Sequence, residues 1–272
     1  MGKSFIVGVL LAFAGLTGCQ CGQVPDPTNV ELGETALVVV LNPRINDLNS
    51  ATVPAPGAQV SGVSVTLGTE DFVTGASGIA VFGGLDGGVT ALEIGQGSLP
   101  LTLVEGELRE LAVASSGSSL QPMADVRYDF NGTEVVELDA GMSITAVNAA
   151  LNGSNRIVLV RGGTYQGDLV FNGSNVTLFG EGASGGRVTL DGNVEVNGSG
   201  NRIRGARITG DLLVDGSGFA LTFSRVEGAT TVTGSDNVLL HNRLCGTTAI
   251  SGGNLTVLEN AGLPPLPPDG GC

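Results

Sequence analysis

The sequence predicts an all-β protein in two parts, a β-sandwich followed by a solenoid of short stacked strands. Three observations support this. The composition has 45 Gly, 14% charged residues and no Trp, which is typical of many short strands joined by tight turns. In the first half, apolar residues alternate with period two. In the second half, a Gly-containing turn recurs at fixed intervals.

Residues 1–18 are expected to form a signal peptide. Lys3 supplies a positive start, and the apolar run Phe5–Leu16 is too short to span a bilayer core of about 30 Å. The run ends in "LTGC" at 16–19, which resembles the lipobox of bacterial lipoproteins. The resemblance implies cleavage before Cys19 and acylation of Cys19, so that the chain is anchored outside the cytoplasm. An ordinary signal peptide that happens to precede a Cys is the alternative.

Three further cysteines are present, and an extracytoplasmic location permits disulfides. Cys245 and Cys272 are the expected pair, because their bridge would hold the Pro-rich tail, residues 263–272, over the end of the solenoid. Such a loop is worth about 3–4 kcal/mol by chain entropy. Cys21 is then left as a free thiol or an intermolecular bridge.

Residues 19–34 are expected to be a lipidated spacer and residues 35–114 a β-sandwich. The alternation in "VSVTL" and "GIAVF" and a spacing of about ten residues favour antiparallel strands. These strands are expected at 36–41, 63–67, 79–82, 89–94, 99–104 and 107–113.

The stretch "TGASGIAVFGGLDGG" at 74–88 resembles the signature of transthyretin-like and Cna-B-like sandwich modules, as found in carboxypeptidase regulatory domains. The resemblance implies a sandwich that acts as a stalk or adhesive spacer, with Phe82 and Leu85 in the core. The matching positions are Thr74, Gly78, Ala80, Phe82, Leu85 and Gly88.

Residues 115–125, rich in Ser and Gly, are expected to be a flexible linker, and residues 126–262 a parallel β-helix. Strands are expected at 126–130 and 135–138. A helix is expected at 143–151, capped by Ser143 and closing the N-terminal end of the solenoid.

The repeat is carried by turn glycines and by aliphatic columns 18 residues apart. Such columns indicate coils that stack about 4.8 Å apart through parallel strand pairing. The turn glycines are Gly153, Gly173, Gly198, Gly216, Gly234 and Gly252, with a second set at Gly210, Gly228 and Gly246. The columns are Val196, Val214, Val232 and Ile250; Ile203, Leu221 and Leu239; and Ile208, Val226 and Leu244.

The segment 143–182 resembles the opening of right-handed parallel β-helix proteins of the pectin-lyase-like class, which begin with an amphipathic helix and a "G-x-Y" strand pair. The alternative is a left-handed hexapeptide helix, because aliphatic residues also recur at multiples of six. That register places Arg202 inside and the column of Ile203 outside. The residues that match the class are Gly153, Ile157, Leu159, Gly163, Thr164, Tyr165, Val176, Leu178, Gly180 and Gly182.

The catalytic motifs of pectin-lyase-like enzymes are not found in the sequence. Paired Asp blocks, "NTD", "HG" and "DFIFG" are all missing, and no motif for a metal or cofactor was recognised. His241 aligns with Gly205 and Phe223 and is expected at the surface. The acids of the coils are scattered, with no pair placed on one strand face: Asp191, Glu195, Asp211, Asp215, Glu227 and Asp236.

Three arginines, Arg207, Arg225 and Arg243, recur every 18 residues and are expected to stack on one outer face. They form either a strip for an anionic glycan, since Arg offers bidentate forks, or a solvated row paired with Glu227 and nearby Asp.

The net charge of −14 argues against a nucleic-acid partner. We therefore expect a lipid-anchored structural or binding protein of the cell envelope, at the cell or outer membrane. Its partners would be the membrane, and a polysaccharide or another envelope protein. A polysaccharide lyase or hydrolase with an atypical site is the alternative.

Overall fold

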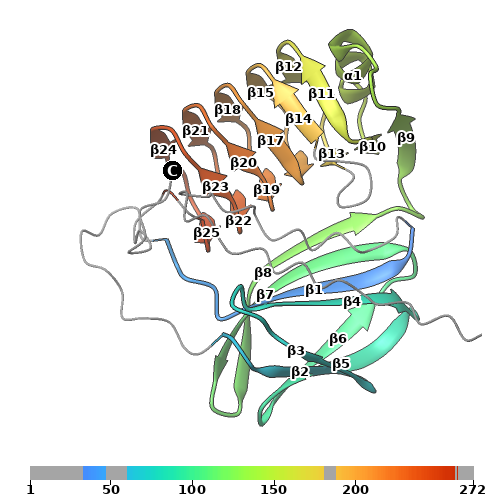
Figure 1. The fold of residues 1–272 in the computed structure, drawn as a ribbon, viewed down its shortest axis with the longest axis vertical. Helices are drawn as coiled ribbons and strands as arrows, with labels where there is room; N and C mark the ends of the chain where they lie inside the picture. Colours follow the sequence, from blue (N-terminus) through green and yellow to red (C-terminus); the bar gives the residue numbers. More distant parts are fainter. Residues whose placement is uncertain (1–32, 47–59, 181–187, 261, 263–272) are drawn as a thin grey trace, which may run out of the picture.

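The computed structural model describes residues 33–46, 60–180, 188–260 and 262, and within them it forms five β-sheets and one helix (Figure 1). The predicted fold class is confirmed: a two-sheet β-sandwich is followed by a right-handed parallel β-helix with a short helix at its N-terminal end.

The sandwich consists of two four-stranded sheets. In the first, called the shared sheet, the order is β4-β1-β7-β8; in the second it is β3-β2-β5-β6. Strand β1 runs antiparallel to β4 and parallel to β7. The strands are β1 Thr35–Leu41, β2 Ser64–Leu67, β3 Glu70–Val73, β4 Ile79–Leu85, β5 Gly88–Ile94, β6 Gly97–Leu103, β7 Glu107–Ser116 and β8 Ser119–Asp129.

The predicted linker at 115–125 is wrong, because these residues lie in the antiparallel pair β7–β8. Gly117 and Ser118 form the turn between the strands, and Gly117 has φ +62°. The same Ser-Gly composition suits a tight hairpin as well as a flexible linker. Residues 126–129, predicted to begin the solenoid, therefore belong to the sandwich.

The β-helix is built from three parallel sheets that the chain visits in turn. The interface sheet contains β9 Glu134–Leu138, β10 Arg156–Val160, β13 Val176–Gly180, β16 Arg202–Arg204, β19 Ala220–Thr222, β22 Val238–Leu240 and β25 Thr256–Leu258. The arginine sheet contains β11 Gly163–Gln166, β14 Val188–Asp191, β17 Ala206–Ile208, β20 Arg225–Val226 and β23 Arg243–Leu244. The groove sheet contains β12 Leu169–Phe171, β15 Val194–Val196, β18 Leu212–Asp215, β21 Thr230–Thr233 and β24 Thr248–Ile250.

The predicted aliphatic columns pair in register along the three sheets. Ile203, Leu221 and Leu239 are each 0% exposed, whereas Arg202 is partly exposed. The left-handed hexapeptide register requires the opposite arrangement, so that alternative is wrong.

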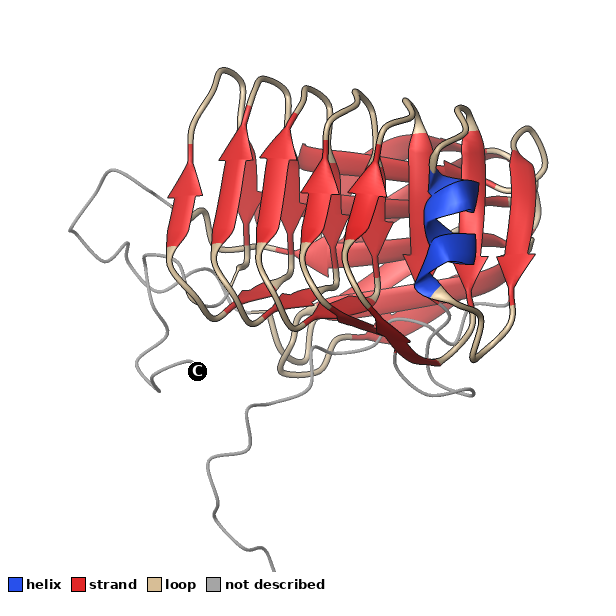
Figure 2. Ribbon diagram, turned by 90° about the horizontal axis from the view of Figure 1, so that it is seen from above, coloured by secondary structure: helices blue, strands red, loops and turns tan. Residues whose placement is uncertain are grey.

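Helix α1, Ile144–Leu151, covers the N-terminal end of the β-helix, as predicted (Figure 2). The Ser143 side chain accepts a hydrogen bond from the backbone N–H of Ala146, and Val147 and Leu151 are buried. The Asn148 side chain joins α1 to β12, because its Oδ1 accepts from the N–H of Val170 at 2.8 Å. These contacts satisfy the helix start and fix it against the first coil.

The last coil is closed by a segment from the start of the chain. Residues 44–46 follow β1 and lie beside β25: Ile45 forms an antiparallel bridge with Leu258, and the N–H of Glu259 donates to the carbonyl of Arg44 at 2.7 Å. The Asn46 Oδ1 accepts from the N–H of Asn260. An exposed edge strand invites pairing with other chains, and these contacts cover part of it. The predicted cover, 263–272, lies outside the described residues.

The turn glycines are required by close stacking of the coils. A Cβ added to Gly198 would lie 1.8 Å from the carbonyl oxygen of Gly173, and one on Gly216 would lie 2.4 Å from that of Gly198. Neither Gly198 nor Gly216 has a positive φ. The left-handed residues of these turns form a neighbouring column, namely Asn155, Asn175, Gly200, Gly218, Asp236 and Asn254. Asn and Asp tolerate this region better than other side chains do.

The sandwich and the β-helix share one hydrophobic core. The outer face of the shared sheet packs on the interface sheet, so that Val38 and Ala112 lie in one cluster with Leu159, Phe179 and Leu240. Strand β1 is consequently buried along its whole length, which explains its unbroken apolar run "ALVVVL". The shared sheet is thus the middle layer of three.

Candidate functional site

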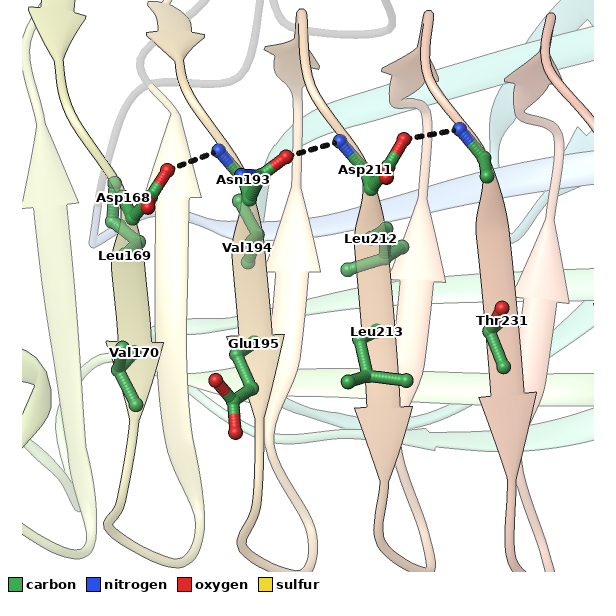
Figure 3. A pocket seen from close by; sticks show the side chains of 11 residues that line it. Asp168, Leu169, Val170, Asn193, Val194, Glu195, Asp211, Leu212, Leu213 and Thr231 are labelled. Atoms are coloured by element: carbon green, nitrogen blue, oxygen red, sulfur yellow. Dashed lines mark hydrogen bonds between the residues drawn. The ribbon is translucent and has the colours of Figure 1, made fainter.

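A groove on the outer face of the groove sheet is the larger of two cavities that the described residues form. It has a volume of about 420 Å³ and crosses β12, β15, β18 and β21. Val170, Glu195, Leu213 and Thr231 lie side by side on successive strands and point outward (Figure 3). Leu213 is 45% exposed. Four neighbouring coils therefore contribute one side chain each to a continuous surface.

The rim of the groove is a ladder of side-chain-to-backbone hydrogen bonds. Asp168 Oδ1 accepts from the N–H of Asn193 at 2.8 Å, and Asn193 Oδ1 accepts from the N–H of Asp211 at 2.9 Å (Figure 3). Asp211 Oδ1 accepts from the N–H of Ala229 at 2.7 Å. The ladder satisfies backbone donors where the chain turns into each strand, so one oxygen of each Asp is occupied in holding the rim.

Glu195 is the carboxylate of the groove that stands outside this ladder. Its Oε1 accepts from Asn197 Nδ2 at 3.0 Å, and it lies between Val170 and Leu213 on the neighbouring strands. No Arg, Lys or His lines the groove. The groove therefore presents apolar patches and hydrogen-bond acceptors, with acidic rather than basic charge.

The sequence prediction named Glu195 and Asp211 among scattered acids, and the structure brings both to this groove. The groove itself was missed. One pattern indicates its rim: Asp168, Asn193 and Asp211 recur with intervals of 25 and 18 residues, each directly before an aliphatic strand. In the described part of the chain, no three His, Cys, Asp or Glu side chains are grouped so as to hold a metal ion.

The three predicted strip arginines stack in register on the arginine sheet. Arg207 pairs with Arg225, and Arg225 pairs with Arg243, on adjacent strands. Glu227 lies between two of them, with its Oε1 at 2.9 Å from Arg207 and 3.0 Å from Arg225. A shared carboxylate weakens the positive field of the strip. Binding of an anion there stays a prediction.

A buried ion pair joins the two parts of the molecule. Arg204 Nε on β16 lies 2.6 Å from Glu110 Oε1 on β7, and the side chains are 1% and 0% exposed. The Tyr128 hydroxyl donates to Glu110 and lies 2.8 Å from Thr222 Oγ1. The Arg204 guanidinium also stands 4.7 Å from the centre of the Phe179 ring. Burial, followed by the nearby Glu110 charge, raises the pKa of Tyr128 well above its usual range.

His241 is more enclosed than the sequence indicates. It occupies a left-handed turn with φ 55°, and its ring packs against Phe223 at 5.2 Å between centroids. Burial lowers the pKa of His241 to about 4, so the imidazole is neutral at pH 7. It does not line the groove.

The predicted lipidation and disulfide sites fall largely on residues that are not described. The signal peptide and Cys19 lie in 1–32, and Cys272 lies in 263–272, so the acylation and the Cys245–Cys272 bridge stay predictions. Cys245 directly follows β23. None of the helices in the described ranges has the length and hydrophobicity needed to cross a bilayer.

Comparison of the chain with protein-family models, curated proteins and solved structures finds no match in any of the three. The chemistry of the outer faces therefore carries the functional argument.

Proposed function

We propose that this chain is a lipid-anchored structural or binding protein of a bacterial cell envelope. Its groove sheet binds an extended, uncharged carbohydrate. The observation that carries the proposal is the groove of about 420 Å³ that crosses four stacked strands. Parallel strands about 4.8 Å apart repeat a similar surface at each coil, which suits a linear polymer with repeating units.

The side chains of the groove match the two kinds of surface that a sugar ring offers. Val170 and Leu213 contact the apolar C–H faces, while Glu195 and Thr231 form hydrogen bonds with hydroxyl groups. The acidic groups disfavour polyuronates and sulfated glycans, because like charges repel at short range. The ligand class supported best is therefore a neutral polysaccharide.

The remaining features of the chain fit the same role. The likeness of residues 74–88 to transthyretin-like and Cna-B-like modules suggests that the sandwich is a spacer. The likeness of residues 143–182 to pectin-lyase-like proteins suggests a carbohydrate ligand without their catalytic groups. The lipobox-like residues 16–19 suggest that the anchor is Cys19 in the membrane, with the β-helix facing outward.

A glycan array, followed by calorimetry with the best ligand, tests the binding proposal on the full chain in a non-ionic detergent. Replacement of Glu195 by Gln and of Leu213 by Ser is expected to weaken binding at least tenfold, since each removes about 1–2 kcal/mol of contact. Glu93→Gln is the matched control, because Glu93 is exposed on β5 of the sandwich. Equal binding by parent and groove variants contradicts the proposal, and release of shortened sugars favours an enzyme instead.

The anchor is tested separately by growth with labelled palmitate in a bacterial host. The parent is expected to carry label and to enter the detergent phase, whereas Cys19→Ala loses both properties. Label retained by Cys19→Ala would contradict the lipid anchor.

A further inference from the structure

A second cavity lies where the sandwich meets the β-helix. It has a volume of about 250 Å³, and three arginines line it: Arg127 from β8, Arg156 from β10 and Arg202 from β16. The chain contains only 12 Lys and Arg in total and carries a net charge of −14. Convergence of three guanidinium groups on one small cavity is therefore unlike the acidic character of the rest of the chain.

The three arginines are unequally neutralised by carboxylates. Arg127 binds Asp125 at 2.9 Å, but both oxygens of Asp125 already accept the fork of Arg109 at 2.8 and 2.9 Å. Arg127 also lies 3.9 Å from Glu107. Asp125 thus serves two guanidinium groups and leaves charge on Arg127 uncompensated.

The two arginines of the β-helix have fewer partners still. Arg156 lies 3.0 Å from the exposed Glu134, while its Nε is buried without an acceptor. Arg202 forms no ion pair with any described carboxylate, and its one hydrogen bond goes from Nη1 to the carbonyl of Gly200 at 3.2 Å. A guanidinium has five N–H donors, so most of the donors of Arg202 remain open to a ligand.

The other polar groups of the cavity do not cancel this charge. The carboxylate that lines it, Asp129, accepts from the N–H groups of Asn131 and Gly132 with one oxygen, which holds the β8 turn. Asn155 and Asn175 bind each other at 2.9 Å. Their remaining amide groups and the hydroxyl of Thr133 are neutral donors at the same cavity.

We propose that this junction cavity binds a tetrahedral oxyanion, phosphate or sulfate, either free or carried on a larger molecule. Arg202 supplies a planar fork for two oxygens of the anion, and Arg127 and Arg156 add charge from either side. Because Arg127 belongs to the sandwich and the other two to the β-helix, the anion bridges the two parts. The proposal does not depend on carbohydrate binding in the groove.

The test is an NMR titration of the full ¹⁵N-labelled chain in non-ionic detergent, following the arginine Nε–H signals. Inorganic phosphate and sulfate are added at low millimolar concentration against chloride at equal ionic strength, and glucose 1-phosphate is the arm for a carried group. Low concentrations matter because phosphate and sulfate stabilise most proteins generally by surface exclusion. Saturable shifts of the Arg156 and Arg202 signals are expected with the oxyanions and not with chloride.

Variants separate this site from general salt effects. Arg202→Gln is expected to weaken oxyanion binding about tenfold or more, since a charge-assisted pair is lost. Arg207→Gln is the matched control, because it removes the same charge from a different sheet of the β-helix and should bind like the parent. Tighter binding of glucose 1-phosphate than of phosphate identifies a carried group. Equal shifts with chloride, or an unchanged affinity in folded Arg202→Gln, overturn the proposal.

Discussion

Replacement of Glu110 by Gln tests whether the buried ion pair holds the sandwich to the β-helix. The change keeps the shape of the side chain but removes its charge, so Arg204 remains buried without a counter-charge. Both side chains are essentially inaccessible, at 0% and 1% exposure, and lie 2.6 Å apart. Breaking such a pair costs about 3–5 kcal/mol.

Two contacts set the expected value at the lower end of that range. The Arg204 guanidinium keeps its positions over Phe179 and Phe223, at 4.7 and 5.7 Å, and a desolvated contact of this kind contributes about 2 kcal/mol. The Gln carbonyl also still accepts a hydrogen bond. We therefore expect Glu110→Gln to lower the free energy of unfolding by about 3 kcal/mol, a large part of the roughly 5–15 kcal/mol of a typical domain.

Urea unfolding followed by far-UV circular dichroism measures this loss. The matched control is the double variant Glu110→Leu with Arg204→Met, in which neither charge is left alone. It is expected to stay within about 1–2 kcal/mol of the parent, because apolar replacements of a buried pair are often neutral. Tyr128 keeps Thr222 as its partner in that variant. A loss below about 1 kcal/mol in Glu110→Gln, or a double variant as unstable as the sum of its single variants, would refute the reasoning.

Three further predictions concern the coils and the shared core. Gly198→Ala is expected to cost about 1–3 kcal/mol in urea unfolding, because its Cβ would meet a carbonyl oxygen at 1.8 Å. The control Gly253→Ala, whose Cβ would lie 4.0 Å from its nearest neighbour, should change little, and equal losses would contradict the stacking argument. For His241, protonation favours the unfolded chain, since burial lowers the folded pKa to about 4 from 6.5. Stability is thus fully present above pH 6.5 and lost as the pH falls towards 4, by about 2 kcal/mol at pH 5 relative to pH 7. His241→Asn, which tolerates the left-handed turn, should lack this part of the pH dependence, and identical slopes would count against it. Finally, thermal unfolding is expected to be one transition because the sandwich and the β-helix share a cluster, and two separated transitions would show independent units.

The register of the β-helix was predictable because its period is fixed. Once the 18-residue interval is found, Val196, Val214 and Val232 align in the sequence as they pair in the structure. The packing of one part on the other was not predictable in this way. "ALVVVL" indicates a strand, but nothing local shows which layer covers its second face.

The sites show the same division. The column of Arg207 and Arg225 follows from spacing, whereas its partial neutralisation by Glu227 depends on how the turn directs a carboxylate. The groove and the junction cavity arise from the relative position of several strands. Arg202 differs from Arg204 by two positions on one strand, and yet the first lines a cavity and the second is buried under the sandwich.

The closure of the last coil by residues 44–46 limits the length of the solenoid. A repeat protein usually gains or loses a coil without disturbing its neighbours. Here the segment beside Leu258 is continuous with β1, so its distance from the shared sheet is fixed by only a few residues of chain. Insertion of one more 18-residue coil would move the terminal edge by about 4.8 Å and carry it past this segment. The sandwich thus acts as a template that specifies how many coils the β-helix contains, and duplication of a coil would need a compensating extension after Leu41.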